Sequence, residues 1–206
     1  SIPSGNVTSG LATGYEVANS CRFNNNDTAY LNKSVGGNAT LNTKATFSTW
    51  FKLGELPKTT HSGSGLFSGK ADDSNRLYIT LAGAAGGSAD DRLLIFGKSG
   101  GSVDCSVVSD MKFRDCSAYY NVVVAFDTTQ GVAANRVKAY VNGSEITLTH
   151  TTSLTQDDAL NLASTNSYIN YVGVLWGVEL DQYFDGYLAE TVFIDGLALT
   201  PTSFGE

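Results

Sequence analysis

The chain carries little charge. Charged residues make up 16% of its 206 residues, and 20 acidic side chains against 13 basic ones leave a net charge of -7. An acidic average surface repels phosphate backbones and anionic lipid, so we expect no nucleic-acid and no membrane partner. No apolar run reaches the roughly 20 residues that a membrane-spanning helix needs. The opening SIPSGNVTSG has neither a basic nor an apolar segment, so we do not interpret it as an uncleaved signal peptide.

Cysteine and histidine are scarce as well. The chain has three cysteines and two histidines. Cys105 and Cys116 could face each other across a hairpin, which would leave Cys21 over, but three reduced thiols in a reducing compartment are the favoured alternative. His61 and His150 have no cysteine or carboxylate at a metal-ligand spacing, which argues against zinc and against a histidine-based triad.

Calcium is the one metal that the sequence leaves open. Pairs of aspartates at positions 72–73, 90–91 and 157–158 could supply oxygen ligands, but no twelve-residue loop pattern organises them. We therefore interpret these pairs as solvated turns and expect no cofactor.

Apolar alternation is what the sequence does contain. The clearest case is residues 119–149, where apolar runs separated by turn residues predict three antiparallel strands. Both faces of YYNVVVAFD are mostly apolar, which predicts a central strand. Asn142-Gly143 offers the two positive-φ residues of a tight hairpin, so EITLT (residues 145–149) is expected to return beside the preceding strand.

Other strands are predicted along the rest of the chain, and no long amphipathic helix is visible. The predicted ranges are 21–23, 29–31, 45–53, 65–69, 76–82, 92–96, 103–108, 167–174 and 186–195. Residues 150–166 show little periodicity and predict a surface loop. Strands without helices predict an all-β fold, a jelly-roll sandwich of two antiparallel sheets. We expect residues 1–14 to form an N-terminal arm and residues 15–206 a single domain.

Two short motifs resemble parts of catalytic sites. GKSGG at residues 97–101 has the spacing of a nucleophile elbow, but a strand rather than a helix follows it, so a hairpin turn is the better interpretation. Glu179-Leu180-Asp181 is similar to part of the E-x-D-x-x-E strand of laminarinase-type glycoside hydrolases. The third carboxylate of that motif would fall at position 184, which is Phe184. We therefore expect no catalytic residues.

Aromatic side chains suggest where a sugar could bind. An aromatic ring offers an apolar face to a sugar ring, and nearby polar groups can bind the hydroxyls. Trp50 lies in a predicted strand and is interpreted as a packing residue. Trp176 and Tyr183 lie in a Gly-flanked acidic segment between strands, and with Asp181 between them they are the predicted carbohydrate-binding residues.

Four stretches together resemble a known family. They are SCRFNNNDTAYLNKS, FSTWFKL, YYNVVVAFDTTQGVAANRVKAYVNGSEI and FDGYLAETVFIDGLALTPTSFGE. In this order and spacing they resemble the concanavalin A-like, laminin-G-type jelly-roll domains of tailed-bacteriophage virion proteins. Where such proteins often have proline and tryptophan, this chain has Cys116 and Tyr120, substitutions that keep the strand pattern.

The resemblance implies a fold of two curved sheets with the first and last strands adjacent. It also implies a structural protein on the virion surface, as a capsid decoration, fibre or tail component. We expect this protein to be non-enzymatic and homo-oligomeric, to dock to other virion proteins through its N-terminal arm, and to have host-glycan binding as a secondary role. Two alternatives stay open: a glycoside hydrolase with Glu179 and Asp181 as its acid pair, and a free-standing lectin.

Overall fold

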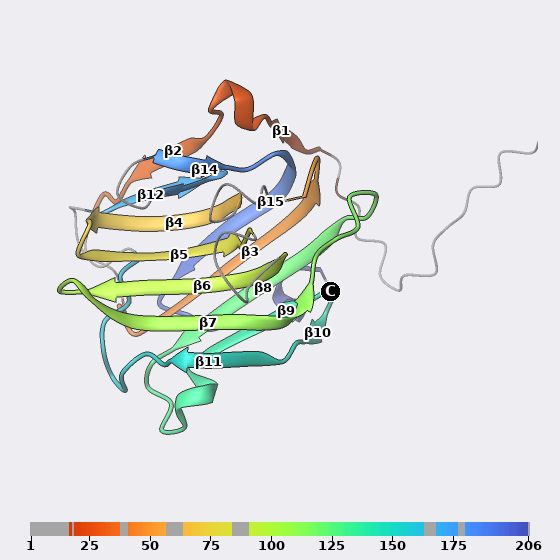
Figure 1. Cartoon of the computed structure of the whole chain (residues 1–206). Helices are drawn as coiled ribbons and strands as arrows, with labels where there is room; N and C mark the ends of the chain where they lie inside the picture. Colours follow the sequence, from red (N-terminus) through yellow and green to blue (C-terminus); the bar gives the residue numbers. More distant parts are fainter. Residues whose placement is uncertain are drawn as a thin grey trace, which may run out of the picture.

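Two antiparallel β-sheets pack face to face, as the alternation predicts (Figure 1). The computed structural model describes residues 17, 19–37, 41–56, 64–83, 91–162, 168–176 and 180–205. The first sheet has the strand order β1 (Cys21–Phe23), β15 (Gly186–Asp195), β3 (Lys44–Leu53), β8 (Tyr120–Asp127), β9 (Val137–Val141) and β10 (Ser144–Glu145).

The second sheet has seven strands. Their order is β11 (Leu148–Thr152), β7 (Ser102–Lys112), β6 (Arg92–Ser99), β5 (Asn75–Leu81), β4 (Ser64–Asp72), β12 (Ile169–Val172) and β2 (Leu31–Ser34). A separate hairpin consists of β13 (Val174–Trp176) and β14 (Leu180–Tyr183). The described residues also form the 3-10 turns η1 (Asn25–Asp27), η3 (Ala133–Asn135) and η4 (Pro201–Ser203).

The core lies between the sheets, on the faces that the alternation marks. In β3 the side chains of Phe47, Phe51 and Leu53 point into it, and all three are almost fully buried. β8 is central as predicted, because β3 and β9 flank it and every residue from Tyr120 to Phe126 is buried. No helix in the described part of the chain is long and apolar enough to cross a membrane.

The last long strand joins the first one, as the resemblance implies. β15 pairs with β1 on one side and with β3 on the other. Arg22 on β1 secures this edge, since its guanidinium donates to the Asp185 carboxylate at 3.1 Å and to the Gly186 carbonyl at 3.2 Å.

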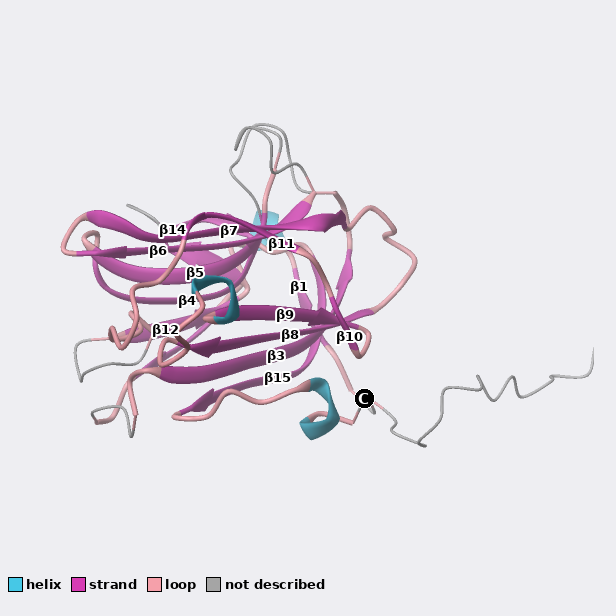
Figure 2. Ribbon diagram, turned by 90° about the horizontal axis from the view of Figure 1, so that it is seen from below, coloured by secondary structure: helices cyan, strands magenta, loops and turns pink. Residues whose placement is uncertain are grey.

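The C-terminal segment covers the outer face of the six-stranded sheet (Figure 2). Thr46 holds it in place: its hydroxyl donates to the Leu197 carbonyl at 2.7 Å and accepts from the Leu199 N–H at 2.8 Å. Thr200 occupies the N-cap position of η4, but its side chain bonds the Thr202 hydroxyl at 3.0 Å and makes no cap hydrogen bond.

The turn predictions were mostly correct. Asn142 and Gly143 have φ values of 47° and 79° and join β9 to β10, as the tight hairpin requires. EITLT stays beside β9 only as far as Ile146, whose N–H donates to the Ala139 carbonyl at 2.9 Å. The prediction was wrong beyond that point, because Leu148 begins β11 at the edge of the other sheet and turns its side chain toward the core.

The prediction of a surface loop over residues 150–166 was also wrong for its described part. β11 continues to Thr152, and Leu154, Leu160 and Leu162 are almost fully buried in the core. These leucines share no regular spacing because they close the end of the sandwich from an irregular backbone, so a periodicity search does not detect them.

The three cysteines are free thiols. The stretch between Cys105 and Cys116 does not form the hairpin that would bring them together, because β7 runs straight on to Lys112. Cys105 points into the core, where burial raises the pKa of its thiol to about 12. A thiol in this environment stays protonated and unreactive at neutral pH.

Candidate functional site

The predicted sugar-binding residues lie on the β13–β14 hairpin. Leu175 pairs with Asp181 and Val174 with Tyr183. The side chains of Trp176 and Asp181 lie outside the described residues, as does Glu179. The Tyr183 ring is half-buried, with its centroid 6.2 Å from that of Tyr30. Tyr183 is therefore part of a packed tyrosine group, and whether these three residues bind sugar stays a prediction.

The hairpin lies flat on the outer face of β4. The Ser68 hydroxyl donates to the Val174 carbonyl at 3.2 Å. Gly65 has no side chain here, and a Cβ at this position would lie 2.2 Å from the backbone of Val174 and of Leu175. Position 184, where a hydrolase of the laminarinase type needs its third carboxylate, is occupied by the fully buried Phe184.

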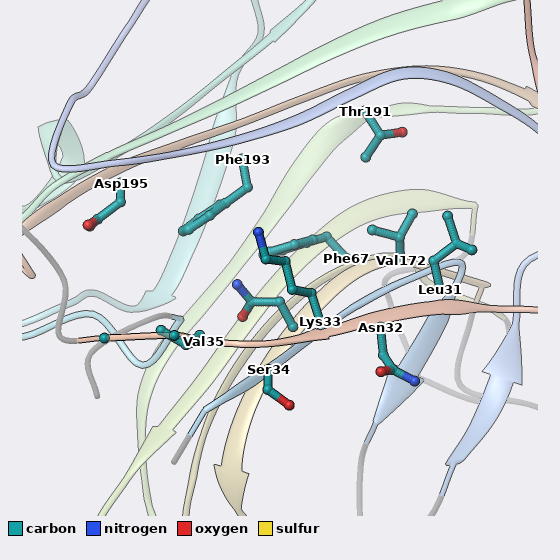
Figure 3. Close-up of a pocket in the computed structure, with 13 residues that line it drawn as sticks. Leu31, Asn32, Lys33, Ser34, Val35, Phe67, Val172, Thr191, Phe193 and Asp195 are labelled. Carbon is teal, nitrogen blue, oxygen red and sulfur yellow. The ribbon is translucent and has the colours of Figure 1, made fainter. Parts of the chain in front are cut away.

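A cleft of about 560 Å³ opens between the two sheets, where the edge strand β2 faces the end of β15 beyond its pairing with β1 (Figure 3). We call it the inter-sheet cleft. Its lining mixes apolar, amide, hydroxyl and charged side chains, with contributions from β2, β4, β12 and β15. The lining residues are Leu31, Asn32, Lys33, Ser34, Val35, Gly36, Gly37, Phe67, Asn170, Val172, Thr191, Phe193 and Asp195.

The strand register determines which side chains of the seven-stranded sheet line the cleft. Val172 pairs with Leu31 on one side and with Phe67 on the other, so these three apolar side chains form one row. Asn170 pairs with Lys33, and because it is two residues from Val172 it faces the same way. Figure 3 shows the Lys33 side chain extending into the cleft toward Phe193.

A β-bulge in β15 determines which side chains of the six-stranded sheet line the opposite wall of the cleft. Ala189 pairs with Trp50 and Val192 with Ser48, so Glu190 and Thr191 together oppose one residue of β3. Glu190 has a φ of 49°, a conformation that non-glycine residues seldom adopt. The extra residue reverses the alternation that follows it.

The reversal turns the end of β15 toward the cleft. Phe193 pairs with the core residue Phe47, and Asp195 with Ala45. Without the bulge, both side chains would point to the outer face of the sheet. The Thr191 and Thr49 hydroxyls bond each other at 2.8 Å beside the bulge. A bulge that redirects side chains is common next to functional sites.

Stacked phenylalanines lead from the core into the cleft. The Phe67 ring stacks on Phe47, with the centroids 5.0 Å apart, and on Phe193, with the centroids 5.1 Å apart. Phe193 ends the stack and is only partly buried, so it offers an aromatic surface to whatever enters the cleft.

Asn170 gives the cleft an unused hydrogen-bond acceptor. Its Oδ1 atom is buried and has no hydrogen-bond partner in the structure. The side chain lies over Gly69, where a Cβ would come within 3.0 Å of this oxygen. A buried acceptor without a donor is unfavourable by about 1–3 kcal/mol.

The acidic pairs do not form a metal site in the described part of the chain, where no three His, Cys, Asp or Glu side chains come together. Asp72 caps its own turn by accepting from the Ser74 N–H at 2.8 Å, and Asp73 forms an ion pair with Lys70. Asp158 accepts from the Ala159 N–H at 2.9 Å. Asp90 and His61 lie outside the described residues.

Sequence reasoning missed the cleft. Lys33 was outside the predicted second strand, which begins at Leu31 and runs to Ser34 rather than over residues 29–31. Phe193 was inside a correctly predicted strand, but its direction depends on the bulge. The one available signal was the apolar-polar pattern of GYLAETVFID, which is interrupted at Glu190 and Thr191.

Solved structures with the same architecture include carbohydrate-binding ones. One is domain 4 of the GH43 extracellular arabinanase AbnA from Geobacillus stearothermophilus, in complex with arabinotriose, with 18% identity over 82% of this chain and 70% of that chain and a TM-score of 0.56. Another is the CBM40 of the Ruminococcus gnavus IT-sialidase bound to α2,3-sialyllactose, with 12% identity over 84% of this chain and 95% of that one and a TM-score of 0.54.

A third is the NanB sialidase of Streptococcus pneumoniae, with 14% identity and a TM-score of 0.58. The match covers 90% of this chain but 27% of the sialidase. At these identities the likeness establishes the fold. No curated protein matches the sequence.

The sequence matches the model of a protein family over most of its length. Residues 23–203 match the family described as the concanavalin A-like lectin/glucanases superfamily, which includes laminin G domains. The matched range runs from the end of β1 to η4 and includes both sheets and the cleft. The chain therefore belongs to the concanavalin A-like lectin/glucanases superfamily.

Proposed function

We propose that this chain is a non-enzymatic carbohydrate-binding jelly roll on the surface of a bacteriophage virion, and that its glycan binds in the inter-sheet cleft. The observation that carries the proposal is the pairing of the Phe193 ring with the unpartnered Asn170 acceptor in one cleft. An aromatic ring packs against the apolar face of a sugar, and an amide forms hydrogen bonds with its hydroxyls.

The size of the cleft suits this ligand class. Small-molecule sites commonly enclose about 300–1,000 Å³, and the cleft has about 560 Å³. Two structures of the same fold were solved with oligosaccharides, arabinotriose in one and α2,3-sialyllactose in the other. Both support an oligosaccharide as the class of ligand.

The chemistry of the cleft favours binding over hydrolysis. Glycoside hydrolases generally use two carboxyl groups that flank the scissile bond. Among the described residues, Asp195 is the one carboxylate that lines the cleft. Hydrolysis at Glu179 and Asp181 is the alternative, and release of reducing ends from β-glucans or bacterial polysaccharides would favour it.

The virion location has its support in the sequence resemblance. In this proposal residues 1–14, which lie outside the described residues, dock the domain to other virion proteins, and the protein is a homo-oligomer. Mass spectrometry of purified virions tests the location directly, because the polypeptide is expected among the structural proteins. Virions that lack it would rule out this part of the proposal and leave a free-standing lectin.

A glycan array tests the binding proposal. We expect the wild-type protein to bind a defined set of glycans and Phe193→Ala and Asn170→Ala each to lose at least tenfold in affinity. Tyr187→Ala is the matched control, since Tyr187 is an exposed aromatic residue that packs against Arg22, with the guanidinium 5.4 Å from its ring centroid, away from the cleft.

Trp176→Ala separates the two candidate sites. The cleft proposal expects this variant to bind as the wild type does. Loss of binding in Trp176→Ala with full binding in Phe193→Ala would place the ligand on the β13–β14 hairpin instead. Absence of binding to any glycan by the folded wild-type protein would contradict the proposed function.

A further inference from the structure

One acidic and one basic side chain line the inter-sheet cleft, and they differ in whether they interact with other residues of the chain. Asp195 already takes part in another interaction. The Lys33 side chain forms no hydrogen bond and no ion pair with the described residues around it. Lys44 and Lys138, by contrast, form ion pairs with Asp127 at 3.2 Å and with Glu145 at 3.0 Å.

The position of Lys33 is fixed by the backbone. β2 is the edge strand of the seven-stranded sheet, and its pairing with β12 puts Lys33 on the inner face beside Asn170. Its side chain therefore extends into the cleft toward the Phe193 ring (Figure 3). Lys33 is exposed, so its ammonium is open to an anionic group of a ligand.

We infer that the glycan carries a carboxylate and that Lys33 binds it. This inference rests on the proposed glycan-binding function and specifies its ligand class. The Lys33 ammonium donates to the carboxylate, the Asn170 oxygen accepts from a sugar hydroxyl, and the Phe193 ring packs against the sugar. Because the whole protein has a net charge of -7, an acidic glycan gains nothing from the average surface field and depends on this local cation.

The test compares acidic oligosaccharides with neutral forms of the same molecules. The probes are oligogalacturonate, oligoglucuronate and sialyllactose, each with its carboxyl-reduced form, titrated into the protein by calorimetry. We expect at least one acidic probe to bind and its carboxyl-reduced form to bind at least tenfold more weakly. Lys33→Met is expected to lose most of the preference for the acid, and Lys33→Arg to keep it.

Lys52→Met is the matched control, because it removes one lysine charge at a site away from the cleft, where Lys52 lies 5.8 Å from the centre of the Tyr119 ring. It is expected to bind as the wild type does. An inward lysine on an edge strand can also serve to prevent pairing with another chain. Lys33→Met protein that self-associates yet keeps the wild-type preference for the acid would overturn the inference.

The outcomes also separate this inference from the proposed function. Equal affinity of the wild-type protein for acidic and carboxyl-reduced probes, or binding confined to neutral glycans, would reject the role of Lys33 and leave glycan binding intact. No binding to any acidic or neutral glycan would reject both.

Discussion

Asn170 is the residue at which folding and binding make opposite demands. Its buried Oδ1 has no partner in the free protein. Replacing it with valine removes an unpaired acceptor and adds a β-branched side chain to a strand, so Asn170→Val is expected to raise the free energy of unfolding by up to about 1 kcal/mol. The same change removes the acceptor for the sugar, so glycan affinity is expected to fall. Urea denaturation and calorimetry on one preparation measure both effects, and a variant that is less stable and binds normally would contradict this role.

His150 links stability to pH. It lies half-buried on β11, where burial lowers the pKa of its imidazole from the ordinary value of 6.5. The folded protein therefore holds the ring neutral while the unfolded chain takes up a proton as the pH falls below that value. We expect His150 to lower the free energy of unfolding between pH 7 and pH 5. In urea titrations at both pH values, His150→Gln should lose less stability than the wild type; an identical loss would contradict the assignment.

Single residues were the level at which the sequence predicted least about the site. Trp176, Asp181 and Tyr183 were chosen for their chemistry, and Tyr183 proves to be packed against Tyr30. Phe193 has equally suitable chemistry, but its direction depends on the positive φ of Glu190, three residues away. A side-chain type can be read from the sequence, whereas the direction of a side chain after a bulge cannot.

Among the elements, β15 is the one whose irregularity forms the site. Glu190 adopts a left-handed conformation that costs a non-glycine residue about 1–2 kcal/mol. Glu190→Gly is therefore expected to raise the free energy of unfolding by about 0.5–1 kcal/mol, and Glu190→Val to lower it. Both keep the bulge, so correctly folded protein is expected to retain glycan binding.

Deleting Glu190 tests whether the bulge itself is needed for binding. Without the extra residue, Thr191 alone opposes Thr49, so Phe193 stays opposite Phe47 and Asp195 opposite Ala45, and binding is expected to persist. Chemical denaturation and glycan titration of the three variants decide the matter. A stable deletion variant that loses binding would contradict the register that places Phe193 in the site.

The β13–β14 hairpin depends on the absence of a side chain beneath it. A Cβ at Gly65 would lie 2.2 Å from the backbone of both Val174 and Leu175. Gly65→Ala is expected to lower the free energy of unfolding by about 1–3 kcal/mol and to lift the hairpin from β4. Hydrogen exchange at Val174 and Leu175 should then accelerate. Gly131→Ala is the control, since a Cβ there meets nothing within 4 Å, and equal exchange in the two variants would contradict this packing.

At the level of elements, the strength of the local signal decided which predictions succeeded. The β9–β10 turn was predicted because Asn142 and Gly143 supply both positive-φ positions. The crossing of Leu148 to the other sheet and the burial of Leu154 depend on contacts between segments far apart in the chain. Such contacts leave no periodic pattern, and so these predictions failed.

In the whole molecule, the fold follows from the alternation and the site from how the sheets meet. Period-two spacing is sufficient to predict two sheets with β8 at the centre of one, because one face of each strand must be buried. The cleft exists because the two sheets stay apart where β2 and β15 face each other. That separation depends on which strands lie at the edges of the sheets. The alternation does not identify these strands, and the sequence indicates them only through its resemblance to a family.

The central claim is that a glycan occupies the inter-sheet cleft. Its most direct test is a titration of isotope-labelled protein with the tightest glycan from the array, followed by the backbone amide shifts in nuclear magnetic resonance spectra. The cleft predicts that the largest shifts fall in β2, β12 and β15, around Lys33, Asn170 and Phe193. Shifts confined to the β13–β14 hairpin, from Val174 to Tyr183, would contradict it.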